Sequence, residues 1–212
     1  MLKVNSKVNG VVAGAASLRT AKDGKSYVSF NLRVNIPGSR NNMPGQEILV
    51  SVSKEGTQDE TQSFSVGKRV EVEGILTFRK NGDNLYFNLR ATNIDFNPEE
   101  TKDRIEGTLE FKGTLGNKVE EKTDKKGNQF IIFSAFSTDK VGEEFQFTWV
   151  RFIRFNAQRE VFMLPKSKIQ ATGQLEVSSY NGRISLDCRC DSVGLWEKKL
   201  PFAPADGEEA PY

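Results

Sequence analysis

The sequence contains no histidine among its 212 residues. This absence excludes Ser-His-Asp and Cys-His nucleophile systems, histidine-ligated zinc and imidazole proton shuttles. Carboxylates, lysines and hydroxyls remain for catalysis, but no acidic pair recurs in a nuclease-like motif. We therefore expect a binding protein rather than an enzyme, with no cofactor and no bound metal.

Cysteine is nearly absent too. The two cysteines, Cys188 and Cys190, would lie on one face of a strand, about 6.6 Å apart. The Cβ atoms of a disulfide lie only about 4 Å apart, so this pair is poorly placed to form one. Two thiols without histidine also make too few ligands for structural zinc. We expect two small buried side chains in a reduced, cytoplasmic protein.

Long apolar runs are missing as well. No segment approaches the roughly 18 apolar residues that a membrane helix needs. The apolar stretch after Lys7 is too short and too broken by glycine for a signal peptide, so we interpret it as a first strand. Apolar residues make up 37% of the chain and charged residues 27%, which is typical of globular proteins.

The chain contains an internal repeat with an offset of about 100 residues. Three matches occur in the same order: residues 22–30 with 125–133, residues 70–76 with 169–175, and Asn81-Gly82 with Asn181-Gly182. Aromatic residues follow Gly24 and Gly127 at the same spacing. We predict two copies of one domain, at residues 1–98 and 104–199, joined by a polar, proline-containing linker.

Each copy has the pattern of strands. Apolar and polar side chains alternate over residues 28–34, as in a half-buried strand, and Asn81-Gly82 is a strong hairpin signal. The polar residues 54–65, and 156–164 in the second copy, fit one short helix each. The order predicts an all-β protein with two tandem five-stranded OB-fold barrels. Another small β-sandwich or barrel is the alternative, because strand order is not readable from sequence.

An OB barrel binds nucleic acid or sugar across one face. Binding single strands without reading sequence requires cations along the phosphates and flat rings for the bases. In the first copy, the second strand, the loop after it and the last hairpin offer both. The candidate nucleic-acid-binding residues there are Tyr27, Asn31, Arg33, Arg40, Arg79, Lys80, Tyr86 and Arg90. Taken singly, these residues could instead be a cross-strand aromatic pair and solvated charges.

The second copy is richer in aromatic residues. Phe145, Phe147 and Trp149 share one face of a strand whose other face is also apolar, so the sequence leaves open which face points inward. The outer face would be a base-stacking platform or a dimer interface. The candidates in this copy are Phe130, Phe147, Trp149 and Arg151. We expect Glu176 and Asp187 to point outward and repel phosphate, which would make the two copies unequal.

The chain ends in an acidic segment rich in proline. Residues 203–212 carry three carboxylates and no Lys or Arg, so the rest of the chain is more basic than the formal net charge of +2. Such a segment cannot bury a core, and we expect residues 200–212 to be disordered.

These motifs resemble the bacterial-type single-stranded DNA-binding protein family. The Asp23-Gly24 turn, residues 28–34 and residues 67–76 carry the resemblance, the last being similar to the family's Lys-Gly-x-x-Val-x-Val-x-Gly-x-Leu segment. The resemblance spans most of residues 4–97 and, more weakly, 104–196. It implies sequence-independent binding and protection of single-stranded DNA in replication, recombination or repair.

The C-terminal tip resembles the family as well. Glu208, Glu209, Pro211 and Tyr212 repeat the family's arrangement of carboxylates before a terminal Pro-Phe, with Tyr in place of Phe. The resemblance implies that this tip docks replication or repair proteins.

Two departures from the family pattern matter. Most members have one OB fold per chain and form tetramers, whereas two folds per chain are associated with dimers, so the resemblance implies a homodimer. The stacking Trp of the family's third strand is missing in the first copy, where Ile48 and Val50 stand. A phage or mobile-element version of the family fits this pattern.

A second hypothesis comes from the two apolar faces around Phe147. It describes a protein–protein adaptor, or a structural module of a replication or phage complex, whose OB folds bind protein. The choice between DNA and RNA stays open, because no residue identifies a contact with a 2′-hydroxyl.

Overall fold

The structure is a computed structural model that describes residues 1–40 and 43–197. The described residues are almost entirely β-sheet, with one short 3₁₀ helix, η1 (Asp59–Ser63). The strands are β1 (Leu2–Val12), β2 (Ser17–Thr20), β3 (Ser26–Ile36), β4 (Gln46–Glu55), β5 (Arg69–Asn81), β6 (Asn84–Asp95), β7 (Arg104–Thr123), β8 (Gln129–Val141), β9 (Glu144–Phe155), β10 (Lys168–Tyr180) and β11 (Arg183–Leu195). The predicted all-β class is confirmed.

Strands β1 and β3 to β6 close into a barrel. β1 pairs with both β3 and β5, β5 pairs with β6, and β4 joins β3 to β6. Every contact is antiparallel except the parallel pair β4–β6. This closed circuit of five strands is the Greek-key order of an OB barrel. The short β2 extends β3 as a hairpin beyond the barrel.

The second half repeats the same circuit. β7 pairs with β8 and β10, β8 pairs with β9, and β11 joins β10 to β9, again through one parallel contact. The Asn-Gly turns recognised in the sequence connect the last two strands of each barrel, with positive φ at Gly82 and Gly182. The tandem OB prediction therefore agrees with the strand pairing.

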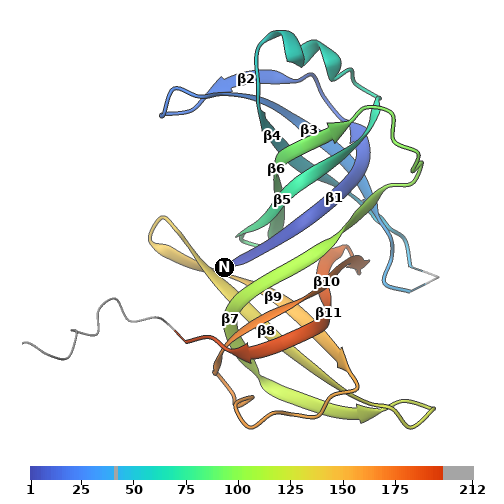
Figure 1. The fold of residues 1–212 in the computed structure, drawn as a ribbon, viewed down its shortest axis with the longest axis vertical. Helices are drawn as coiled ribbons and strands as arrows, with labels where there is room; N and C mark the ends of the chain where they lie inside the picture. The colour runs from blue at the N-terminus through green and yellow to red at the C-terminus, as the bar shows by residue number, and fades with distance from the viewer. Residues whose placement is uncertain (41–42, 198–212) are drawn as a thin grey trace, which may run out of the picture.

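The two barrels share one continuous sheet. β1 pairs antiparallel with β7, in a register that runs from Leu2 opposite Phe111 to Asn9 opposite Arg104. Figure 1 shows the barrels one above the other, with β1 and β7 side by side at the junction. Backbone hydrogen bonds therefore fix the barrels relative to each other.

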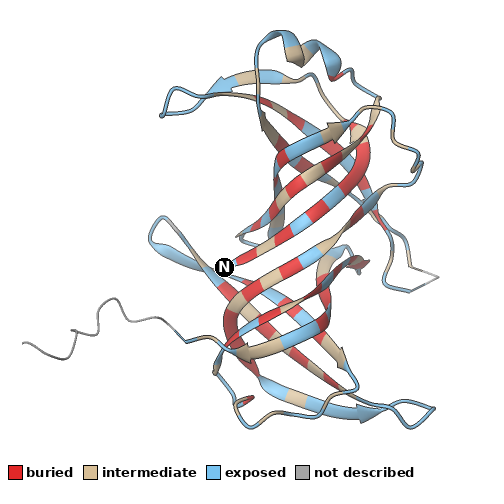
Figure 2. Ribbon diagram, viewed as in Figure 1, coloured by how far each residue is buried: buried red, intermediate tan, exposed pale blue. Residues whose placement is uncertain are grey.

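Each barrel has a core made by every second residue of its strands (Figure 2). In the first barrel, Phe30 stacks on Phe64 with ring centroids 4.3 Å apart. In the second, Phe133 and Phe152 stack at 4.9 Å. These inward residues leave the alternate residues of the same strands on the outer face.

The predicted helices differ between the copies. Residues 54–65 contain η1, so the first prediction is confirmed as a single 3₁₀ turn. The prediction for residues 156–164 is wrong, because this segment forms turns and no helix. Asn156 has a positive φ, and Met163 bonds to the carbonyl of Glu160 in an isolated turn. Among the described residues, no helix is long and apolar enough to cross a membrane.

The residues between the barrels are anchored to the first one. The Asp103 carboxylate accepts hydrogen bonds from the Asn35 backbone N–H at 2.8 Å and its side-chain amide at 2.7 Å. It also accepts one from Arg69 at 2.8 Å. Burial on its own raises the pKa of Asp103, but these hydrogen bonds outweigh it and the pKa is lowered. The entry to β7 is thus tied to β3 and β5.

Both cysteines lie on β11 as buried, free thiols. Burial raises the pKa of Cys190 to about 11 and raises that of Cys188 as well. Both groups therefore stay protonated near neutral pH, which suits packing rather than chemistry.

Candidate nucleic-acid interface

The burial of its residues shows which face of β9 points into the core. Phe145, Phe147 and Trp149 are 60%, 44% and 50% exposed, whereas Val150 and Phe152 are buried in the core. The aromatic row therefore faces solvent on the outside of the second barrel. Exposed apolar surface of this size usually marks a site where another molecule binds.

Strand β8 completes an aromatic surface beside this row. Its register places Phe136 opposite Trp149 and Phe130 opposite Phe155. The rings pack against one another. The ring centroid of Phe136 lies 4.8 Å from that of Trp149 and 5.3 Å from that of Phe147, and the centroids of Phe130 and Phe155 are 5.9 Å apart. We call the outward aromatic residues of β8 and β9 the aromatic platform; they are Phe130, Phe136, Phe145, Phe147, Trp149 and Phe155.

Three arginines border the platform. Arg151 continues the β9 row, and Arg189 of β11 lies over the Phe155 ring at 5.4 Å from its centroid. Arg151 also forms an ion pair with Asp187 at 2.5 Å. Asp187 lies on the outer face opposite the exposed Glu176, as expected, but it is largely buried there and its charge is paired with Arg151.

The third arginine, Arg40, comes from the other barrel. The loop after β3 bonds to the end of β10, with Ser39 N–H donating to the Ser179 carbonyl and Ser179 N–H to the Pro37 carbonyl. This docking makes Arg40 part of the wall of a depression that Trp149 and Arg151 also line. A residue predicted for the first copy thus lies beside the second.

The first barrel presents the equivalent outer face across β3, β4, β6 and β5. Cross-strand register aligns Asn31, Ser51, Asn88 and Thr77 in one row. Ser29, Ser53, Arg90 and Ile75 form the next row. The predicted residues Asn31, Arg33, Arg79, Tyr86 and Arg90 all lie on this face and are exposed.

Several first-copy candidates have partners within the protein. Asn31 accepts a hydrogen bond from Ser51 at 3.1 Å, and Arg33 lies 3.6 Å from the Glu47 carboxylate. Tyr27 is half-buried opposite Arg19 and Glu55, and Lys80 is half-buried as well. Asn31 and Arg33 thus have polar partners on the neighbouring strand β4.

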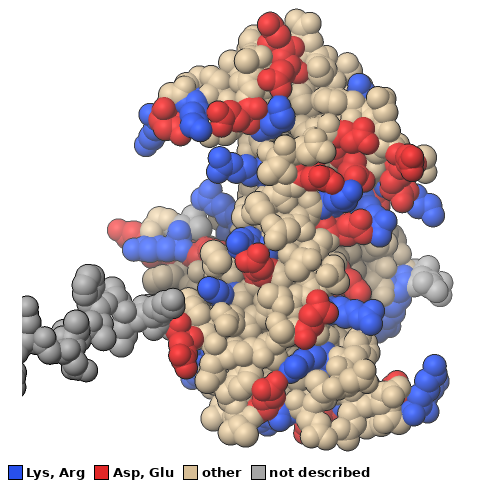
Figure 3. Space-filling view, in the orientation of Figure 1, with Lys and Arg blue, Asp and Glu red and all other residues tan. Residues whose placement is uncertain are grey.

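Charges of both signs are interspersed on the face of the molecule shown in Figure 3. No broad single-sign area covers either barrel in that view. A nucleic acid would therefore be held by local cations and ring contacts rather than by a strong overall field.

Comparison with known proteins shows similarity in structure only. No family model matches the chain, and no curated protein matches it. The structure is similar to the wild-type single-stranded DNA-binding protein from Thermus aquaticus, with a TM-score of 0.45 and 15% identity, covering 96% of this chain and 97% of that one. A deletion mutant of that protein has a TM-score of 0.46 at 15% identity, over 95% and 97% of the two chains.

A shorter structure is similar to part of the chain. The small single-stranded DNA-binding protein from Streptomyces coelicolor has a TM-score of 0.35 and 21% identity, covering 45% of this chain and 93% of that one. The assignment of two OB barrels rests on the strand pairing described above.

Some residues of the interface were missed by sequence reasoning. Phe136, Phe155 and Arg189 belong to the platform or its border. Arg19 lines a groove on the outer face of the first barrel. Phe136 shares the outward face of β8 with Phe130, and Phe155 shares that of β9 with Phe147. Strict alternation of side chains along each strand would therefore have found both. Arg189 has no such signal, because the pairing of β9 with β11 is not visible in the sequence.

The predicted tail and its tip lie outside the described residues.

Proposed function

We propose that this chain binds single-stranded DNA without reading its sequence, as a binding protein and not an enzyme. One observation carries the proposal: exposed aromatic rings of β9 and half-buried rings of β8, bordered by arginines, cover the outer face of two adjacent strands of an OB barrel. OB folds bind oligonucleotides on this face. Stacking on rings is tolerant of sequence, because every base has a π-face.

Tryptophan fluorescence tests the proposal directly. Oligo(dT) should quench Trp149, which lies in the platform, and the Trp149→Phe variant should lose that signal while Trp196→Phe keeps it. A duplex of equal length should bind far more weakly, because its bases are not free to stack. Affinity should also fall between about 50 and 200 mM salt. Equal binding of duplex, or no response to salt, would refute the proposal.

A second candidate function is favoured by the same exposed rings. An adaptor that binds protein would cover Phe145, Phe147 and Trp149 with an apolar partner surface. Recovery of a defined protein partner after nuclease treatment, from a chain that fails to bind oligo(dT), would favour the adaptor.

The biological setting follows from the resemblance of the sequence motifs. We propose a cytoplasmic role in DNA replication, recombination or repair, with the tip around Pro211 and Tyr212 docking partner proteins. We also propose a homodimer that presents four OB folds. Sedimentation equilibrium should then give a mass near twice 23.7 kDa.

A further inference from the structure

We infer that the two barrels hold different parts of the same strand: the second stacks bases, and the first binds the sugar–phosphate backbone. This inference rests on the proposed single-strand binding and assigns a separate chemistry to each barrel. It comes from a comparison of the two outer faces, position by position.

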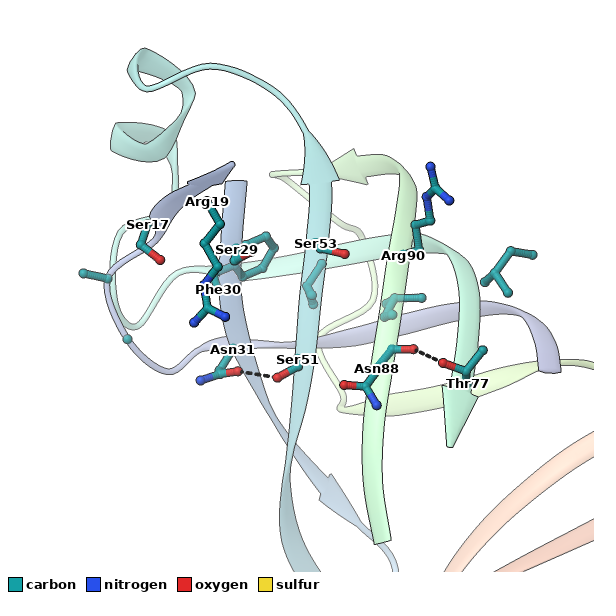
Figure 4. A pocket seen from close by; sticks show the side chains of 15 residues that line it. Ser17, Arg19, Ser29, Phe30, Asn31, Ser51, Ser53, Thr77, Asn88 and Arg90 are labelled. Carbon is teal, nitrogen blue, oxygen red and sulfur yellow. Dashed lines mark hydrogen bonds between the residues drawn. The ribbon is translucent and has the colours of Figure 1, made fainter. Parts of the chain in front are cut away.

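The first barrel has a groove lined by polar and apolar groups together. Its volume is about 640 Å³, and it lies between the loop before β2 and the outer face of β3 to β6. Hydroxyl and amide groups dominate its labelled walls in Figure 4. The polar lining residues are Ser17, Arg19, Ser29, Asn31, Ser51, Ser53, Thr77, Asn88 and Arg90.

Two arginines stand on opposite sides of this groove, Arg19 on β2 and Arg90 on β6 (Figure 4). Within residues 1–40 and 43–197, neither has a carboxylate oxygen within 4.0 Å. Of the arginines that border the platform, Arg151 is instead paired with Asp187, Arg189 lies over the Phe155 ring, and Arg40 comes from the loop of the first barrel. The groove therefore holds cations whose charge is available to a phosphate.

One platform ring has an aromatic counterpart here: Tyr27, half-buried on β3, holds the position of Phe130 in the repeat. The other rings have none. By cross-strand register, the positions of Phe136 and Phe147 in the second barrel are held in the first by Arg33 and Glu47, which form an ion pair. The aromatic ring lining the groove, Phe30, is buried and stacked on Phe64. Tyr86, exposed at the hairpin end, is outside the groove.

This chemistry fits phosphate and sugar oxygens. Arginine and serine side chains make most of their contacts with nucleic acid at the backbone, where no base is read. Ser51 and Thr77 already donate to Asn31 and to the Asn88 carbonyl. The remaining hydroxyl and amide groups between the two guanidinium groups offer such contacts along the groove. Bases would find stacking partners only after the strand reaches the platform of the second barrel.

The test uses two double variants of the full chain and two labelled ligands. Arg19→Ala/Arg90→Ala removes the groove cations, and Phe147→Ala/Trp149→Ala removes two platform rings. Each is titrated by anisotropy with oligo(dT) and with an abasic deoxyribose-phosphate strand of the same length, across a salt series. Lys3→Ala/Lys7→Ala changes net charge equally on the β1 face, and Val161→Ala/Leu164→Ala removes exposed apolar groups outside the platform.

The groove variant should bind the abasic strand more weakly, with Arg40 still present, and should flatten the log–log salt slope for oligo(dT) by about 1.4, near 0.7 per lost phosphate contact. The platform variant should bind oligo(dT) about tenfold to a hundredfold more weakly, with an unchanged slope and unchanged abasic binding. Both controls should match the wild type.

Two outcomes separate the inference from the function it rests on. If the wild type binds oligo(dT) but the two variants lose abasic binding and salt slope equally, the division between barrels is wrong while the proposed function stands. If the wild type does not bind oligo(dT) at all, the proposed function itself fails.

Discussion

The indole of Trp149 lies against the backbone of β7 because residue 116 is glycine. A Cβ at Gly116 would lie 3.3 Å from the Trp149 ring and 2.8 Å from the Ser134 carbonyl oxygen. Phe136 covers the ring from another side at 4.8 Å. Trp149 is thus held at the surface by its neighbours, which reduces the entropy lost when a base stacks on it.

At the scale of single residues, the contacts of Asp103 predict how a substitution there changes the free energy of unfolding. Asp103→Asn keeps the side-chain size but removes the charge that Arg69 faces and weakens the hydrogen bonds from Asn35. Loss of charged hydrogen bonds of this kind should destabilise the protein by about 1–3 kcal/mol at pH 7. The shift in the midpoint of urea unfolding measures this, with the exposed Asp83→Asn as control.

The lowered pKa of Asp103 sets the direction in which its contribution to folding stability changes with pH. Its pKa is lower folded than unfolded, so its stabilisation is fully present above the unfolded pKa, near 3.8, and is lost as pH falls toward the folded value. The difference between wild type and Asp103→Asn should therefore shrink on going from pH 7 to pH 3. A variant as stable as the wild type at pH 7 would show that the anchor contributes nothing.

At the scale of elements, the loop after β3 connects the barrels' binding faces. Gly38 bridges to Ser179, and the loop folds so tightly that a Cβ at Gly38 would lie 2.2 Å from the Met43 carbonyl oxygen. Only a residue without a side chain fits this position. The loop carries Arg40 to the depression beside Trp149.

Gly38→Ala should therefore detach Arg40 from the second barrel. We expect less than a tenfold loss of oligo(dT) affinity and a salt slope flatter by about 0.7, the effect of one lost phosphate contact. Arg40→Ala should do the same, and the double variant should lose no more than either single one. Gly194→Ala, where a Cβ meets nothing within 4 Å, is the control. Additive losses would mean that the loop acts in some way other than through Arg40.

At the scale of the whole molecule, the shared sheet sets the geometry of binding. Since β1 and the first part of β7 are paired from Leu2 opposite Phe111 to Asn9 opposite Arg104, a strand that crosses both faces meets them at a fixed spacing. Two barrels on a flexible linker would bind as loosely tethered modules, whereas these are held together before the ligand arrives. The outer side of this sheet carries ion pairs such as Lys3 with Glu110, so this surface is polar and offers no apolar contacts to another molecule there.

The acidic tail belongs to this scale too. Deleting residues 206–212 removes three carboxylates that phosphate repels, so oligo(dT) affinity should be unchanged or slightly higher. Capture of a replication or repair protein should be lost, because the Pro211-Tyr212 end is the proposed docking element. Anisotropy and a pull-down after nuclease treatment measure the two effects. A large fall in DNA affinity would contradict the assignment of the tail to partners.

Much of the fold was predictable because its signals are local. Alternation at period two identifies strands such as residues 28–34, and the Asn-Gly pairs identify hairpins, since both depend on the backbone geometry of neighbouring residues. The repeat then predicted that the second half copies the first. The helix expected at residues 156–164 failed because polarity alone does not distinguish a helix from a series of turns.

The candidate residues were found from parity, which states only that two side chains share a face. Parity correctly grouped Phe147 with Trp149, but the face that points outward depends on what packs against β9, and Val150 and Phe152 occupy the core. Likewise, the pairing of Arg151 with Asp187 and the arrival of Arg40 beside Trp149 join residues far apart in the chain. Composition, repeat and strand pattern thus determined two copies of a β domain and their candidate surfaces, and the strand pairing decided that each is an OB barrel. The tertiary structure alone decided which surface is aromatic, which is polar and which charges are already paired, because these depend on long-range register.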